Sequence, residues 1–440
     1  MKNSTKTLVF ACAAMIVLVI AVLGGKAGSM YPSITRGSAS STEQEKPVTI
    51  RIAWWGGDAR HDYTKKVIEL YESMHPHITI DAEEYANYDD FWKRMAPLAA
   101  AGELPDLIQI DTSYYAQYAE KQLLADLTPF LGNAIDISNI NDHVLKAGYY
   151  NGGNYGMSLG INVLGFQYDP DILRKIGLTS IPSDWTWDDY EKLAIKAQQL
   201  GLYMDDGMRP EIFFAYYLRT QGASLYNAAG TGLGYEDDQL FIDYFGRLVR
   251  LAHNKATPSS EEKAQIKGFA DNNLSKGKQI GIWQWSNQYV AMQQAVDRPL
   301  AIAPMVGPNR DKGLYLKSSM FFSIAESSKV KSEAAKFIDF WINDLEANRL
   351  ILGERGVPVS SVIQESIKPW LTEAQQQVMD YVSWAEQNSA TGDPVDPVGS
   401  AEMIEQLKWI WEQMEYKQMS VEDAASQFRL SAAEILSEHR

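Results

Sequence analysis

Aromatic and acidic side chains stand at the ends of two apolar, strand-like segments of the chain. The first set is Trp54, Trp55 and Asp58, and the second is Asp111, Tyr114 and Tyr115. Aromatic faces bury apolar surface, and carboxylates accept the stronger kind of hydrogen bond. This combination favours binding of a ligand that has both apolar faces and polar groups.

The elements around these residues predict that both sets meet at one edge of a sheet. Strands and helical faces alternate in the order strand 48–54, helix 63–74, strand 78–82, helix 91–99 and strand 107–110. This order is typical of an α/β fold with a parallel sheet. In such sheets, ligands bind beyond the carboxyl ends of the strands. We therefore expect the aromatic and acidic residues to line a ligand site.

Trp54 and Trp55 point to opposite faces if both continue the strand. Trp54 is in phase with Ile50 and Ile52, so Trp55 is the one expected to face ligand. The alternative is that both tryptophans pack in the core.

Asp111 and the tyrosines also have two interpretations. Asp111 stands where a helix begins, so it can act as an N-cap, a ligand contact or both. Tyr118 is the i+4 partner of Tyr114, which indicates that one of Tyr114 and Tyr115 packs inward. Weaker candidates for the same edge are Glu84, Tyr85 and Tyr88.

Composition excludes several classes of protein. The chain has 440 residues, with 40 Lys and Arg against 56 Asp and Glu and a formal charge of −16, so we expect no nucleic-acid partner. One cysteine excludes an intrachain disulfide framework. The GxSxG, HExxH and GxxxxGK[ST] motifs are absent from the sequence. We expect no cofactor, no metal (His75 and His77 included) and no catalysis.

The N-terminal segment predicts export. Lys2 and Lys6 precede an apolar run, Leu8 to Leu23, followed by small residues. We interpret residues 1–28 as a signal peptide or membrane anchor, and 29–47 as a flexible linker. Cleavage, retention and lipidation at Cys12 stay open, so the body is either anchored at the outer face of the cytoplasmic membrane or secreted or periplasmic.

Five ordered segments carry a resemblance to a known family. They are GELPDLIQIDTSYYAQYAEKQLLADLTPF (102–130), YGMSLGINVLGFQYDPDILRKIGL (155–178), WTWDDYEKLAIKA (185–197), LSKGKQIGIWQWSN (274–287) and SIAESSKVKSEAAKFIDFWINDLEANRLILGERGVPVS (323–360). The chain resembles the extracellular solute-binding proteins of carbohydrate ABC transporters, the maltose-binding-protein-like family 1. The region after Pro358 matches weakly.

The resemblance implies a two-lobed periplasmic-binding-protein-like fold with a ligand cleft between the lobes. It implies three hinge crossings, near Met157–Asn162, Ile302–Pro304 and Val357–Ser360. Lobe I is then 48–158 plus 304–356, and lobe II is 162–301 plus 358–440.

The resemblance also implies ligand contacts. Asp111 falls on a cleft-lining position, Trp283 on the stacking aromatic of lobe II, and Trp285 on a neighbouring tryptophan. Asn162 stands where some members carry a ligand-facing carboxylate, and Asn287 is a weaker candidate. Because Trp283 and Trp285 are two apart on a strand, they share a face. The alternative for both is a packed aromatic pair.

The resulting functional hypothesis is a monomer that binds a carbohydrate, most plausibly an oligosaccharide, and delivers it unaltered to ABC permease subunits by hinge closure. Two other classes stay open. One is an extracellular glycoside hydrolase or lyase, of which the hydrolase needs a suitably spaced carboxylate pair. The other is a co-receptor that presents sugar to a membrane sensor. The sequence does not identify the sugar.

Overall fold

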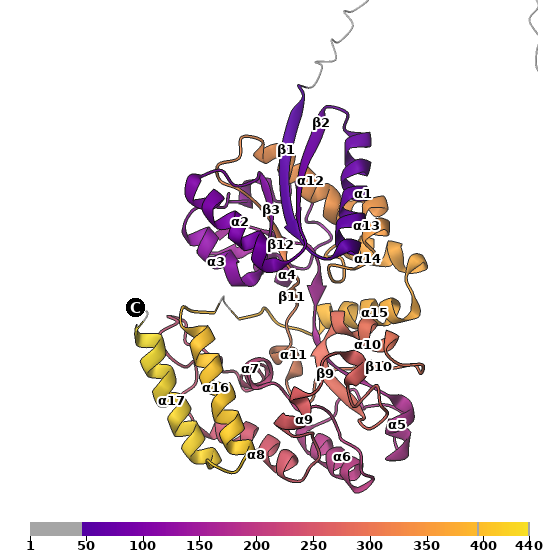
Figure 1. The fold of residues 1–440 in the computed structure, drawn as a ribbon, viewed down its shortest axis with the longest axis vertical. Coiled ribbons are helices and arrows are strands. Elements are labelled where there is room, and N and C mark those ends of the chain that lie inside the picture. Colours follow the sequence, from indigo (N-terminus) through magenta and orange to yellow (C-terminus); the bar gives the residue numbers. More distant parts are fainter. Residues whose placement is uncertain (1–45, 394–395, 439–440) are drawn as a thin grey trace, which may run out of the picture. The chain divides into compact units, whose positions relative to one another are not determined.

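A computed structural model describes residues 46–393 and 396–438, which form an α/β structure. The predicted signal or anchor segment and nearly all of the predicted linker lie outside the described residues. Within the described part, no helix is long and apolar enough to cross a membrane. Two separate sheets organise the chain, and we call them and their helices lobe I and lobe II (Figure 1).

Lobe I is built on a five-stranded sheet with the order β2-β1-β3-β12-β6. β1, β2 and β3 are parallel, and β12 runs antiparallel to β3 and β6. The carboxyl ends of β1 and β3 therefore meet at one edge, as predicted. The strands are β1 (Val48–Trp55), β2 (Ile78–Tyr85), β3 (Leu107–Ile110), β6 (Met157–Ser158) and β12 (Phe321–Ile324).

Helices cover both faces of this sheet because β1 is apolar on both. Ile52 and Trp54 belong to one hydrophobic cluster with Tyr63 of α1 and Trp341 of α12, whereas Trp55 belongs to a second cluster with residues of α2 and α3. The helices of lobe I are α1 (Asp58–Met74), α2 (Tyr88–Ala101), α3 (Thr112–Glu120), α4 (Asp142–Lys146), α12 (Lys331–Asn343) and α13 (Leu345–Ile351). A small hairpin of β4 (Tyr149–Tyr150) and β5 (Gly153–Asn154) follows α4.

Lobe II is built on a three-stranded antiparallel sheet with the order β10-β8-β9. Its strands are β8 (Leu164–Tyr168), β9 (Gly281–Trp285) and β10 (Ala301–Ala303). The helices in or after this part are α5 (Pro170–Lys175), α6 (Trp187–Gln199), α7 (Pro210–Thr220), α8 (Gln239–His253), α9 (Ser260–Ala264), α10 (Tyr289–Gln294), α11 (Arg310–Gly313), α15 (Glu373–Gln387), α16 (Ser400–Glu415) and α17 (Val421–Glu438). α14 (Ser361–Ile367) packs on α13 of lobe I, so this part of the range 358–440 does not belong to lobe II as predicted (Figure 1). α16 and α17 lie side by side (Figure 1).

Three chain segments join the two lobes and are hydrogen-bonded to one another. β7 (Ile161–Asn162) pairs antiparallel with β11 (Lys317–Ser318). The backbone of Ile161 also exchanges two hydrogen bonds, of 2.8 and 3.1 Å, with Val357. The crossings therefore form a ribbon with β7 at its centre.

The second crossing lies later in the chain than the sequence analysis predicted. Residues 301–303 are strand β10 of the lobe II sheet. The segment after it stays with lobe II, since the Tyr216 hydroxyl donates to the Val306 carbonyl at 2.9 Å and the Arg219 guanidinium donates to the Gly313 carbonyl at 2.9 Å. The crossing is β11, so we place the lobe II boundary near 316 instead of 301.

Two local features complete the fold. Phe269–Asp271 forms a single 3-10 turn. Asp344 separates α12 from α13: its backbone is extended, and its side chain caps α13 by accepting from the Ala347 amide at 2.8 Å.

Candidate ligand-binding site

A group of aromatic rings lies at the carboxyl edge of the lobe I sheet. Tyr114 stacks on Trp92 with ring centres 3.8 Å apart, and Trp55 meets Tyr88 edge to face at 5.4 Å. Trp55 is only 9 % exposed and is packed against Phe91 as well, at 4.8 Å. The half-buried rings of Tyr88 and Tyr114 therefore offer more surface than Trp55. The sequence analysis did not single out Trp92.

Asp111 has the position of an N-cap but does not act as one. It precedes α3 in extended conformation, and its side chain makes no capping hydrogen bond. Its Oδ1 atom is buried and has no hydrogen-bond partner in the described residues. Burial and then the charge of Asp111 raise the pKa of Tyr88 above its usual value. Asp111 thus places a carboxylate acceptor beside the aromatic group.

Two predicted contacts of lobe I, Trp54 and Tyr115, are buried in the core, and a third, Asp58, is exposed. Trp54 is fully buried and donates to His61 Nδ1 at 3.0 Å, as its phase indicated. Tyr115 is 1 % exposed, stacks on Phe321 at 4.7 Å and donates to the Gly148 carbonyl, so it is the tyrosine that packs inward. Asp58 is exposed as the first residue of α1.

Trp283 belongs to the core of lobe II, and the prediction that it offers a stacking face does not fit its burial. It is 1 % exposed, with Trp185 stacked at 5.6 Å and Phe166 at 4.5 Å. Asn287 is exposed in a 3-10 turn after β9. Other rings thus cover Trp283, as the alternative of a packed aromatic residue expected.

Trp285, at the end of β9, is the more accessible of the two tryptophans. Its ring lies 5.9 Å from that of Tyr315, edge to face. The Lys317 ammonium lies 4.8 Å from the centre of the Trp285 ring. The Arg219 guanidinium lies over the ring of Tyr315, 4.8 Å from its centre. The same guanidinium pairs with Asp393 at 2.6 Å. Cations therefore cover both aromatic rings.

Lys317 lies on the ribbon, where charges from both lobes affect its pKa. Burial and then the charge of Arg209 lower the pKa of Lys317, while Asp111 of lobe I and Asp396 of the C-terminal region act in the opposite direction. Lys317 is paired in the ribbon with Asn162, whose buried Oδ1 has no partner within the described chain. The neighbouring Arg209 donates to Gln284 at 3.4 Å.

We call this group the junction site and define it by its members. They are linked pairwise by ring contacts, backbone pairing, a hydrogen bond or charge: Tyr88, Asp111 and Tyr114 of lobe I, Asn162 and Lys317 of the ribbon, and Arg209, Gln284, Trp285, Tyr315 and Asp396. It combines aromatic surface with charged donors and unsatisfied acceptors, so it suits a ligand rich in hydroxyl groups. Lys317, Arg209 and Tyr315 were missed because no periodic pattern marks their segments.

Other features of the structure lie away from the junction site. A hollow of about 620 Å³ lies between Trp187 and Val421, and one of about 450 Å³ lies beside Arg51 and Arg94. Neither is lined by any of the predicted ligand residues. Among the described residues, no group of three His, Cys, Asp or Glu side chains could hold a metal ion.

Two sheets joined by three crossings define the class of two-lobed solute-binding folds, and known structures agree. An extracellular solute-binding protein family 1 member from Alicyclobacillus acidocaldarius subsp. acidocaldarius has a TM-score of 0.79 and 26% identity, covering 90% of this chain and 100% of that one. An oligogalacturonide-binding protein from Yersinia enterocolitica has a TM-score of 0.72 and 21% identity, covering 89% and 100%.

A cyclic α-maltosyl-1,6-maltose-binding protein from Arthrobacter globiformis also shares the fold, with a TM-score of 0.72 and 17% identity, covering 89% of this chain and 100% of that one. Residues 66–377 match the sequence profile described as bacterial extracellular solute-binding protein. The chain belongs to this family, whose members bind solutes outside the cell.

Proposed function

We propose that the chain binds an oligosaccharide at the junction site and passes it, chemically unaltered, to the permease subunits of an ABC importer. The observation that carries the proposal is the position of Lys317, which contacts Trp285 of lobe II and is influenced by Asp111 of lobe I. A sugar has apolar C–H faces and a rim of hydroxyl groups. The rings would hold its faces, and Asp111, Asn162 and Lys317 would bind its rim.

Binding to both lobes would drive closure. A ligand shifts a conformational equilibrium only by its differential affinity for the two states, so it must contact both lobes in the closed one. Tyr88 and Asp111 on one side, with Trp285 on the other, meet this requirement. The solved relatives support the ligand class, since their names state oligogalacturonide, cycloalternan and cyclic α-maltosyl-1,6-maltose as bound compounds.

The remaining parts of the proposal concern partners and place. We propose that the protein acts as a monomer, since a single chain supplies both sides of the junction site. The N-terminal apolar run would hold the body at the outer face of the cytoplasmic membrane or direct its secretion. The acidic surface, with a formal charge of −16 for the whole chain, would steer docking to basic permease loops.

A panel of neutral and acidic oligosaccharides tests the proposal. We expect at least one to raise the melting temperature and bind with micromolar Kd, about −8 kcal/mol, with no product detected by chromatography. Turnover that is lost on replacing a single carboxylate would make the protein an enzyme. Absence of stabilisation by every saccharide would remove the carbohydrate assignment. Cells that lack the permease genes should take up no sugar. If the protein still binds the sugar and these cells still respond to it, the protein acts in sensing.

A further inference from the structure

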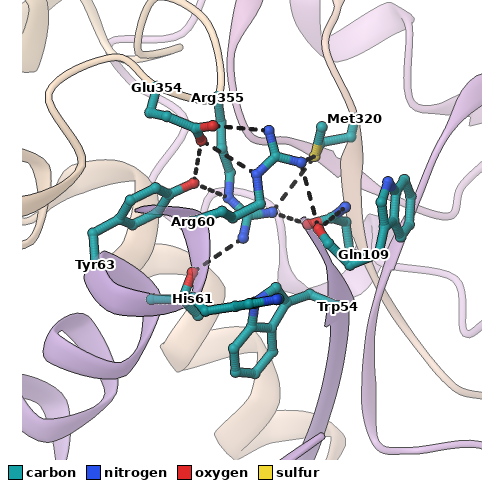
Figure 2. Close-up of polar contacts among 10 residues, drawn as sticks. Trp54, Arg60, His61, Tyr63, Gln109, Met320, Glu354 and Arg355 are labelled. Carbon is teal, nitrogen blue, oxygen red and sulfur yellow. Dashed lines mark hydrogen bonds and ion pairs between the residues drawn. The ribbon is translucent and has the colours of Figure 1, made fainter. Parts of the chain in front are cut away.

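A buried arginine stands directly before the third crossing. Arg355 is 1 % exposed and precedes Gly356 and Val357 of the ribbon. It donates to the Tyr63 hydroxyl at 2.8 Å, to Thr64 Oγ1 at 3.2 Å and to Gln109 Oε1 (Figure 2). In the described part of the chain no carboxylate pairs with its guanidinium within 4.0 Å. Burying a charge that is hydrogen-bonded only to neutral acceptors carries a large desolvation free energy. An apolar side chain at this position would avoid that free-energy cost.

The hydrogen bonds of Arg355 continue to the ligand edge of lobe I. Gln109, which accepts from Arg355, donates through Nε2 to the Trp55 carbonyl at 3.3 Å. Gln109 lies on β3, two residues before Asp111, which follows the strand. Trp55 is the last residue of β1. One side-chain amide thus ties the ends of the two strands that carry the lobe I part of the junction site.

A second arginine closes the network. Arg60 pairs with Glu354 at 3.1 Å and also donates to the Trp55 carbonyl at 3.4 Å. Glu354 accepts from the Tyr63 hydroxyl at 2.5 Å. Figure 2 shows Glu354, Tyr63 and the two arginines pointing toward one another.

The network also reaches the second crossing. Met320 follows β11 in the chain, and its sulfur accepts from Arg355 at 3.5 Å and from Arg60 at 3.9 Å. Two of the three crossings therefore meet the carboxyl ends of β1 and β3 through one set of polar contacts.

We propose that Arg60, Glu354 and Arg355 are positioning residues that couple the second and third crossings to the ligand edge of lobe I. Their role is to fix the direction in which the crossings leave lobe I, and hence how closely lobe II approaches Asp111. The inference rests on the proposed function, because it concerns the affinity of the same junction site. It predicts that breaking the network changes lobe approach as well as stability.

The coupling can be tested with Arg60→Met, Glu354→Gln and the double variant. Both side chains are part-exposed, at 16 % for Arg60 and 38 % for Glu354, so they are more suitable for substitution than the buried Arg355. Arg349→Met is the matched control, since it breaks the exposed Arg349–Glu346 pair of 2.7 Å on α13. With whichever saccharide binds the wild type, we expect roughly tenfold weaker affinity in each single variant and little further loss in the double. The control should stay within about twofold of wild type.

A ligand-free measurement separates this inference from the proposed function. Spin labels on Glu69→Cys and Lys196→Cys, both exposed sites, report the distance between lobes in a chain carrying Cys12→Ser. Network variants should broaden the distance distribution, Arg60→Lys should restore it in part, and Arg349→Met should leave it unchanged. A lower melting temperature with unchanged distances and affinity would overturn the inference and leave a purely structural network, whether or not any saccharide binds.

Discussion

The ammonium of Lys317 lies 4.8 Å from the centre of the Trp285 ring, so a residue of a hinge crossing covers an aromatic face of lobe II. A sugar that stacks on this face of Trp285 would have to displace the Lys317 side chain. We expect the displaced ammonium to donate a charged hydrogen bond to the hydroxyl rim of the sugar. Under the proposed function, ligand stacking and this hydrogen bond from the hinge are then linked.

Lys317→Ala should weaken saccharide binding about tenfold, because charge-assisted hydrogen bonds contribute about 1.5–3 kcal/mol. Isothermal titration calorimetry measures the change. Arg349→Ala is the matched control, since Arg349 lies 4.2 Å over the exposed Trp370 and should not alter binding. Equal or tighter binding by Lys317→Ala would show that the lysine only obstructs the ring.

The two tryptophans of β9 should separate binding from stability. Trp283→Ala removes a ring that is 1 % exposed, so it should cost about 3–5 kcal/mol in the free energy of unfolding. Trp285→Ala should instead lower affinity about 10- to 100-fold with a small change in stability. Urea unfolding and calorimetry of both variants give the comparison. Unchanged affinity in Trp285→Ala would exclude it as a stacking residue.

Asp111→Asn should reduce affinity about tenfold or more while leaving stability within about 0.5 kcal/mol, because its side chain caps nothing. Asn87 provides the converse control. It caps α2 by accepting from the Asp90 amide at 2.9 Å, so Asn87→Ala should cost about 1 kcal/mol without weakening binding. A large stability loss in Asp111→Asn would favour a structural role for that carboxylate.

Gly160→Ala should destabilise the ribbon, because a Cβ at this position would lie 2.3 Å from the Arg355 carbonyl oxygen. Backbone must shift to relieve this contact, so both the melting temperature and affinity should fall. Gly57→Ala is the control, since nothing lies within 4 Å of the added Cβ and its φ is −82°. Thermal unfolding and titration of both variants decide the prediction. A wild-type melting temperature for Gly160→Ala would show that the crossings are loosely packed.

Asp206 should make stability depend on pH. Burial and then the charge of Asp205 raise the pKa of Asp206 to about 7. The folded state thus favours the protonated acid, and this contribution is present below pH 3.8 and is lost as the pH rises through 7. Asp206→Asn should therefore be more stable than wild type by up to about 4 kcal/mol at pH 8 and close to it near pH 4. Exposed Asp184→Asn should show no such crossover in thermal unfolding.

The sequence pattern predicted those features of lobe I that depend on residues close together in the sequence, such as the phase of β1. The alternation of Ile50, Ile52 and Trp54 gave the correct phase of β1, because one face of the strand packs on α1 and the other on α2. The same alternation placed Trp54 in the core. It did not show that Phe91 and Trp92 also cover Trp55, since that burial depends on how α2 lies over the strand.

Tertiary contacts decided the rest. Spacing predicts that Trp283 and Trp285 share a face, but it does not show that Trp185, far earlier in the chain, covers the ring of Trp283. Lys317 joins the junction site because β11 pairs with β7, across more than 150 residues of sequence. No single segment carries a signal for such a pairing.

The central place of Ile161 in the three-crossing ribbon limits the motions open to the protein. Because Ile161 is bridged to both Ser318 and Val357, the three links cannot slide past one another without losing backbone hydrogen bonds. The three segments can still bend together about one hinge axis, whereas twisting of one lobe against the other would break these hydrogen bonds. Opening of the lobes should therefore be a rotation about a single axis, which would restore the same relative orientation of the lobes each time a ligand is bound and released.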